Sequence, residues 1–208
     1  MERETSQLDL WCSRHSRSLF ALACLVCQAM LKSRCPQAFT NPQFYAEDGR
    51  YFFADAYNHG WSSLWYRANG YFHLYPRLLA NIGLSVGIPV LWMPALFVAG
   101  TFLVYMVVWA YVFHRMPMPV QGRVFATLAT VLMPLGNEIW MNLTNVQWPM
   151  SLLIPLIVWG TPGRGVWMAV VDAGLLIFAC FTGPYALVVL QVMLLQVARD
   201  PHSGGSTT

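Results

Sequence analysis

The stretch LFVAGTFLVYMVVWAYVF, residues 96–113, decides the fold class of this sequence. It contains no charged residue, and His114 and Arg115 close it. An apolar run of this length predicts a helix that crosses a membrane. Apolar and polar residues do not alternate along the run, so a strand of a membrane β-barrel does not fit it.

The composition extends this prediction to the whole chain. Of the 208 residues, 57% are apolar and 10% are charged, and the mean hydropathy is +0.48. Soluble domains are about one-quarter charged, so this chain favours lipid as its surroundings. Helices and closed barrels are the structures that satisfy their backbone groups in lipid. We therefore predict an all-α fold, a multi-pass transmembrane helical bundle of about five to six spans.

Polar stretches between apolar segments define the predicted organisation. An N-terminal tail, 1–17, precedes a membrane domain, 18–198, and the polar tail 199–208 is predicted to be disordered. Residues 32–77 form one long external loop with short interfacial helices. The apolar segments are 18–31, 77–90, 96–113, 119–135, 145–160, 165–181 and 184–198. The first of them fits a signal anchor, with a cleaved signal peptide as the alternative.

Lysine and arginine residues in short loops predict the orientation of the chain. The breaks predicted to face the cytoplasm lie beside Arg115, Arg123, Arg164 and Arg199. The breaks 136–144 and 182–184 carry neither lysine nor arginine and are predicted to face outside. Threading the chain backward puts the 32–77 loop outside as well and residues 1–17 in the cytoplasm. Three polar stretches thus converge on one membrane face, where we expect a site.

The strongest candidates for chemistry are two adjacent carboxylates in PQFYAEDGRYFFADAYNHGW, residues 42–61. Glu47 and Asp48 can take different roles. One carboxylate accepts a proton from an attacking hydroxyl, while the other orients the first carboxylate or holds a divalent metal such as Mg or Mn. Arg50 can pair with them or meet a phosphate. The alternative is an ordinary interfacial loop, in which acidic and aromatic residues need no task.

Four further polar residues are candidate substrate-binding groups near the same membrane surface. They are His73, Arg77, Asn145 and Gln147. Helix capping and interfacial anchoring are the alternative for the last two. Asp172 lies inside the predicted span 165–181, where a carboxylate is a functional candidate by default. Near the cytoplasmic end of that span, a structural hydrogen bond or ion pair is favoured over a proton or ion path.

Several classes of function are excluded by what the sequence lacks. The net charge is +3 and the basic residues do not cluster, so no nucleic-acid partner is expected. There is no GxGxxG, P-loop or HExxH motif, so the sequence does not support a nucleotide-binding protein or a zinc hydrolase. The five cysteines form no readable disulfide framework, and Cys24 and Cys27 in an apolar run favour packing.

The order of features resembles the amino-terminal half of the GT-C glycosyltransferases. A short first span is followed by a loop with YAEDG and FF, by YPRLLANI, and by a proline-flanked span. NEIWMNLTNVQWPMSLL (137–153) and FTGPYALVVL (181–190) fit the same family of bacterial membrane proteins. The resemblance implies an enzyme of the bacterial cytoplasmic (inner) membrane that transfers a sugar from a polyprenyl phosphate at the outer face.

The resemblance also implies roles for the acidic doublet. Asp48 would be the base for an inverting attack and Glu47 its partner, with a metal as a further option. Members of the family normally have more spans, so the resemblance implies either a truncated member or a split one, in which a second chain supplies the missing spans. The alternative is a non-enzymatic multi-pass membrane protein, a subunit or transporter-like partner.

Overall fold

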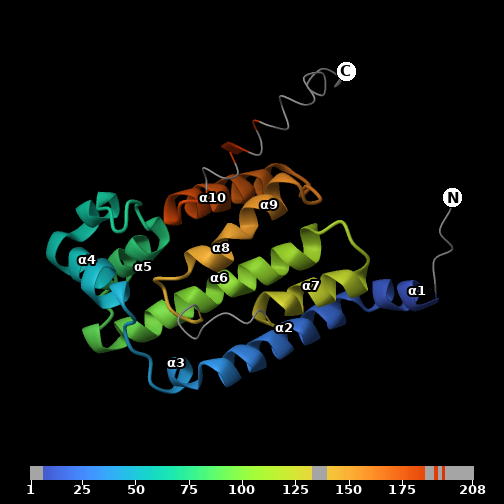
Figure 1. Ribbon diagram of the computed structural model, residues 1–208, viewed down its shortest axis with the longest axis horizontal. Helices are drawn as coiled ribbons and strands as arrows, with labels where there is room; N and C mark the ends of the chain where they lie inside the picture. Colours follow the sequence, from blue (N-terminus) through green and yellow to red (C-terminus); the bar gives the residue numbers. More distant parts are fainter. Residues whose placement is uncertain (1–6, 133–139, 186–189, 192–193, 195–208) are drawn as a thin grey trace.

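The computed structural model describes residues 7–132, 140–185, 190, 191 and 194, which form helices joined by turns and loops, with no β-strand among them (Figure 1). The helices are α1 (Gln7–Arg14), α2 (Ser16–Arg34), α3 (Pro36–Thr40), η1 (Asp48–Phe53), α4 (Ala54–His59), η2 (Gly60–Trp65), α5 (Leu74–Ser85), η3 (Val90–Trp92), α6 (Met93–Arg115), α7 (Val120–Leu132), α8 (Gln147–Ser151), α9 (Leu153–Val158) and α10 (Val166–Thr182). The predicted tail 199–208 and most of the segment 184–198 lie outside the described residues.

The prediction of a bundle with five or six membrane spans is wrong. Among the described residues, one continuous helical stretch is long and apolar enough to cross a membrane: Val90–Arg115, 26 residues with a mean hydropathy of 2.1. It contains the apolar run 96–113. Three shorter apolar helices, of 10–17 residues, lie over the predicted spans 119–135, 145–160 and 165–181.

Proline and charged residues explain why the number of membrane spans was overestimated. The predicted span 145–160 divides at Leu152 into α8 and α9, which contain Pro149 and Pro155. Proline lacks the backbone N–H that a continuous helix needs. The described part of α7 covers Val120–Leu132 of the predicted span 119–135, and residues 133–135 lie outside the described residues. The helix α2 has 19 residues, but its ends include Arg17, Lys32 and Arg34.

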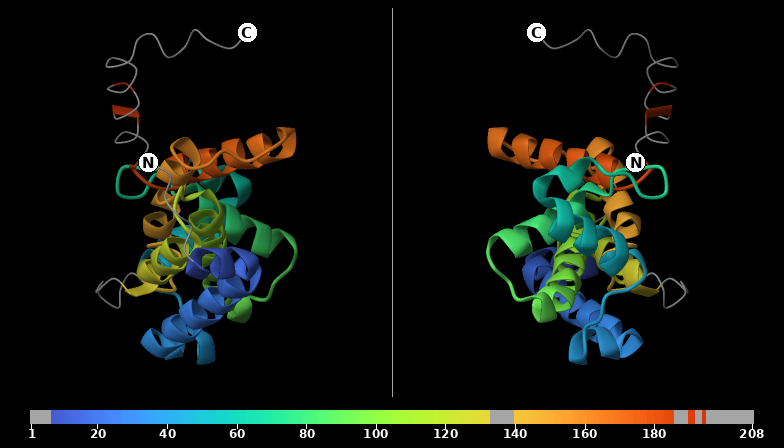
Figure 2. Two further views of the ribbon diagram at one scale, coloured as in Figure 1. Left: turned by 90° about the vertical axis from the view of Figure 1, so that its right-hand side faces the viewer. Right: turned by 90° about the vertical axis from the view of Figure 1, so that its left-hand side faces the viewer.

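The helix α6 forms the centre of the structure (Figures 1 and 2). The α2–α7 pair lies on one side of it, and α10 lies on the opposite side. Trp109 is fully buried on the α7 side, where its indole N–H donates to the Thr130 hydroxyl over 2.9 Å. Phe97 and Val108 are buried in the cluster on the α8–α9 side. Protein therefore covers much of the one candidate span.

The predicted 32–77 loop is largely folded into short helices. It contains α3, η1, α4 and η2, which agrees with short helices in this segment. The turn of η1 is a π-helix, a form that is rare and is frequently found at functional sites. Figure 1 shows α4 and α5 gathered at the N-terminal end of α6. The acidic doublet thus lies at that end of the bundle.

Close contact between α5 and α6 depends on Gly100. The Tyr75 hydroxyl donates to the Gly100 carbonyl over 2.8 Å, and a Cβ added at Gly100 would lie 2.2 Å from Leu79 Cδ2. We expect Gly100→Ala to lower the free energy of unfolding by about 1–3 kcal/mol, because the added methyl group overpacks this contact. Thermal unfolding of the purified chain in detergent checks this.

Gly174 provides the matched control for that substitution. It lies inside α10, and a Cβ added there would meet no atom within 4 Å. Gly174→Ala should be neutral or stabilising by up to about 1 kcal/mol, because alanine is the better helix former. Equal unfolding temperatures for the two variants would contradict the role given to Gly100.

Candidate functional site

Three polar segments far apart in the sequence meet at the end of the bundle that carries the doublet. Asp48 bonds to Leu143 and Thr144 in the loop before α8. The backbone N–H of Tyr75, at the start of α5, donates to the Thr182 hydroxyl at the end of α10 over 3.1 Å. The rings of Trp148 and Tyr185 lie 5.4 Å apart, between α8 and the segment after α10. The residues expected to share one face are therefore neighbours.

Asp48 is a buried carboxylate that joins two of these segments. Asp48 is only 2% exposed, and its Oδ1 accepts a hydrogen bond from the Thr144 hydroxyl over 2.7 Å. Oδ2 accepts from the backbone N–H groups of Tyr45 and Leu143, both over 3.4 Å. Burial raises the pKa of Asp48 to about 6, against the opposing effect of these hydrogen bonds. Through these hydrogen bonds, Asp48 joins the 45–48 segment to the 143–144 segment.

The raised pKa of Asp48 makes stability depend on pH. The folded pKa of about 6 exceeds the ordinary 3.8, so the stabilising contribution is complete below about pH 4 and is lost as pH rises through 6. A shift of this size corresponds to roughly 3 kcal/mol. In Asp48→Asn we expect this slope to be absent, because the amide cannot ionise. Chemical unfolding of both proteins in detergent from pH 4 to 7.5 measures it.

The asparagine variant should still fold because its hydrogen bonds can be reassigned. The Thr144 hydroxyl also lies 3.3 Å from the Tyr45 carbonyl. In the variant, the amide N–H₂ donates to Thr144, Thr144 donates to that carbonyl, and the amide oxygen keeps the two backbone N–H groups. Glu47→Gln leaves Asp48 and its partners in place and should retain the slope. A slope unchanged in Asp48→Asn would contradict the assignment.

Glu47 lies in a more accessible position than Asp48. It is partly exposed and immediately precedes η1. Its charge acts on His73, whose pKa it raises against a larger opposing effect. Glu47 is therefore the carboxylate of the doublet that a substrate hydroxyl can approach with less rearrangement.

His73 is a buried neutral imidazole beside the doublet. It is 1% exposed, and its ring lies 4.0 Å from the ring of Tyr71 and 5.0 Å from that of Phe52. Desolvation lowers its pKa to about 4. Nε2 lies 3.1 Å from the Ala68 carbonyl, which assigns the proton to Nε2 and leaves Nδ1 as an acceptor. Nδ1 is buried and has no hydrogen-bond partner among the described residues.

Arg77, one helical turn after His73, is held by its own partners. It is fully buried, and Nη1 donates to Asp55 Oδ2 over 2.8 Å while Nε donates to the Phe72 carbonyl over 3.1 Å. Within the described part of the chain, Nη2 has no hydrogen-bond partner. The sequence does not reveal this pair, because no local spacing links positions 55 and 77.

The other predicted binding residues differ in how near they come to the doublet. Arg50 is exposed, and its guanidinium lies 5.2 Å from the ring of Tyr51. The backbone N–H of Asn145 donates to Asn142 Oδ1 over 2.9 Å, which is a turn contact. Gln147 Oε1 is buried without a hydrogen-bond partner in the described residues, close to Gly183. Gln147 thus joins the convergent segments, whereas Arg50 faces solvent.

The doublet offers few free ligands for a divalent metal among the described residues. The described residues contain no group of three or more His, Cys, Asp or Glu side chains that could hold one. Both oxygens of Asp48 already accept hydrogen bonds, which leaves Glu47 as the remaining carboxylate. The Mg or Mn site stays a prediction, and no step below depends on it.

Asp172 belongs to a separate cluster at the other end of α6. Arg115 Nη2 lies 2.7 and 2.8 Å from the two carboxylate oxygens, and the Tyr111 hydroxyl donates to Oδ1 over 2.7 Å. Arg115 Nη1 also donates to the Thr161 carbonyl over 2.9 Å. This is the ion pair that the sequence favoured for Asp172. Arg115, at 5% exposed, is thus a buried structural residue.

Comparisons with known proteins find no relative of this chain. No family model, curated protein or solved structure matches the chain. The resemblance to GT-C glycosyltransferases therefore stays a prediction.

Proposed function

We propose that the chain is a transferase that moves a sugar from a polyprenyl-phosphate donor to an acceptor hydroxyl. The observation that carries this proposal is the bond between Asp48 and Thr144, which draws the acidic doublet and the 141–147 segment into one site. Buried polar atoms without hydrogen-bond partners in the described residues lie around it, on His73, Arg77 and Gln147. Such groups indicate a ligand more readily than a purely structural loop end does.

The proposed reaction uses the two carboxylates in different roles. Glu47 accepts the proton of the acceptor hydroxyl as its oxygen attacks the anomeric carbon. The bond from that carbon to the phosphate oxygen breaks, and its electron pair leaves with the polyprenyl phosphate. The sugar is transferred with inversion. Asp48 acts as a positioning residue that fixes the segment carrying Glu47. The sequence favoured Asp48 as the base, and its 2% exposure supports the reverse assignment.

A location in a membrane is part of this proposal. The support for it is the Val90–Arg115 helix, whose N-terminal end lies beside the folded loop of the doublet. A lipid-linked donor would then meet the site at the membrane surface. A second chain that completes the enzyme, and the bacterial inner membrane as its place, are proposed on the resemblance alone.

The experiment that tests the function is a transfer assay with defined donors. Membranes containing the full chain are supplied with farnesyl-phosphoryl mannose or farnesyl-phosphoryl glucose, and the release of farnesyl phosphate is measured. Release above that of membranes without the chain supports the proposal. If donors of both kinds remain intact, and the purified chain binds no farnesyl phosphate, the alternative of a non-enzymatic membrane partner is favoured.

A further inference from the structure

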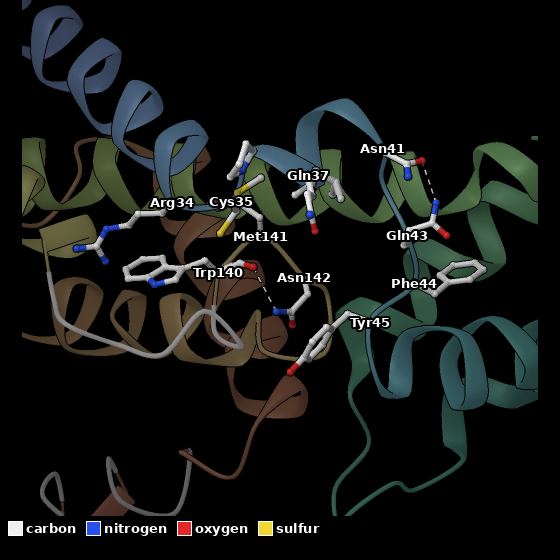
Figure 3. Close-up of a pocket in the computed structure, with 13 residues that line it drawn as sticks. Arg34, Cys35, Gln37, Asn41, Gln43, Phe44, Tyr45, Trp140, Met141 and Asn142 are labelled. Carbon is white, nitrogen blue, oxygen red and sulfur yellow. Dashed lines mark hydrogen bonds between the residues drawn. The ribbon is translucent and has the colours of Figure 1, made fainter.

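A cavity of about 610 Å³ lies next to the doublet (Figure 3). None of the described residues that line it is a predicted site residue. Its wall is formed by the end of α2, by α3 and the segment after it, and by residues 140–142. The volume is within the range typical of small-molecule sites, about 300–1,000 Å³. No carboxylate is among the described residues that line it, so a cation is a poor candidate.

Four side-chain amides line the cavity. They belong to Gln37, Asn41, Gln43 and Asn142. Each amide both donates and accepts hydrogen bonds, which matches a sugar hydroxyl that does the same. Two of the amides are already oriented: Gln43 Nε2 donates to Asn41 Oδ1 over 3.1 Å, and Asn142 Nδ2 donates to the Trp140 carbonyl over 3.3 Å. Figure 3 shows the Gln37 amide directed from α3 into the space bordered by Asn142 and Tyr45.

Aromatic rings complete the wall of the cavity. Tyr45 is exposed and provides a flat apolar surface, against which the C–H face of a sugar ring can pack. Trp140 is 3% exposed: its ring stacks on Tyr105 at 6.1 Å and the Arg34 guanidinium lies 5.0 Å from its centroid, so it forms part of the rigid wall rather than a free face. An isoprenoid or acyl chain would fit poorly here, because it would desolvate the amides without giving them hydrogen bonds.

We propose that this cavity binds the sugar of a carbohydrate acceptor. The combination of paired amides with the exposed ring of Tyr45, close to the doublet, carries the inference. The backbone N–H of Tyr45 donates to Asp48 Oδ2, and Asn142 directly precedes Leu143, which donates to the same oxygen. A sugar in the cavity would therefore lie against the segments that hold Glu47. Its role as an acceptor rests on the proposed function, whereas its binding does not.

Binding is tested with simple glycosides and the full chain in detergent. Saturation-transfer NMR is recorded with the methyl glycosides of mannose, glucose, galactose and N-acetylglucosamine. We expect at least one of them to bind the wild-type chain. In Asn41→Ala/Gln43→Ala, two exposed amides are lost and the signal should correspond to at least about tenfold weaker binding. Asn58→Ala removes an exposed amide on α4, outside the cavity, and should leave binding unchanged.

The outcomes separate the cavity from the catalytic proposal. Binding that is lost in the double variant and kept in Asn58→Ala supports the inference, provided that the unfolding temperature is unchanged. If no glycoside binds, or the double variant binds as well as the wild type, the inference is overturned. If glycosides bind in this way but no donor is cleaved in the transfer assay, the sugar site stands and the proposed function fails.

Discussion

Glu47→Gln should lower the rate of sugar transfer by about 10²- to 10⁴-fold, the range that removal of a general base usually costs. The amide keeps the size of the side chain but cannot accept the proton of the attacking hydroxyl. Because Glu47 is partly exposed and accepts none of the bonds that hold Asp48, the unfolding temperature should change little. Release of farnesyl phosphate from the defined donors, at equal protein level in the membrane, measures the loss.

Asp48→Asn is the matched comparison for this prediction. As a positioning residue whose hydrogen bonds the amide can replace, Asp48 should tolerate the change with a loss of less than about tenfold. The reverse pattern, a large loss in Asp48→Asn and a small one in Glu47→Gln, would make Asp48 the base. Full activity in both variants would remove the doublet from the mechanism.

The largest effect on stability is expected from Asp172→Leu. This change leaves the Arg115 guanidinium, whose side chain is 6% exposed, without its carboxylate. Breaking a buried ion pair from one side costs about 3–5 kcal/mol, because the remaining charge is buried without compensation. The Tyr111 hydroxyl loses its acceptor as well. Denaturant unfolding in detergent measures the change in the free energy of unfolding.

The double variant Arg115→Met/Asp172→Leu tests the cause of that loss. Removing both charges avoids the unpaired ion, so the double variant should be more stable than Asp172→Leu alone. Part of the loss should remain, because the Thr161 carbonyl no longer receives its hydrogen bond from Arg115. If the effects of the two single changes simply add, the ion pair is not the source of the stability.

The sequence predicted the long central helix well and its neighbours poorly. Residues 96–113 lie inside α6 because an uninterrupted apolar run without proline has few other structures available. The apolar segments on either side also form helices, but hydropathy does not show where a helix ends. Pro149 and Pro155 divide the segment 145–160 into two short helices, so the number of spans was overestimated.

The candidate site was predicted in part, through its order along the chain. Glu47, Asp48, His73 and Gln147 were selected as polar groups between apolar segments, and the structure brings them to one end of the bundle. Thr144, the closest partner of Asp48, lies 96 positions further along the chain, and no local pattern links the two. The Arg77–Asp55 pair and the amides around the cavity depend on tertiary contacts, which no local pattern records.

The bond between Asp48 and Thr144 joins positions 96 residues apart, and this separation bears on how the protein folds. Contacts between distant positions form slowly, because the intervening chain must first be ordered. During synthesis the carboxylate emerges long before the hydroxyl that covers it, so it stays hydrated and charged until α6 and α7 have been made. Closure of this end of the molecule should therefore be a late event, in which Asp48 loses its water.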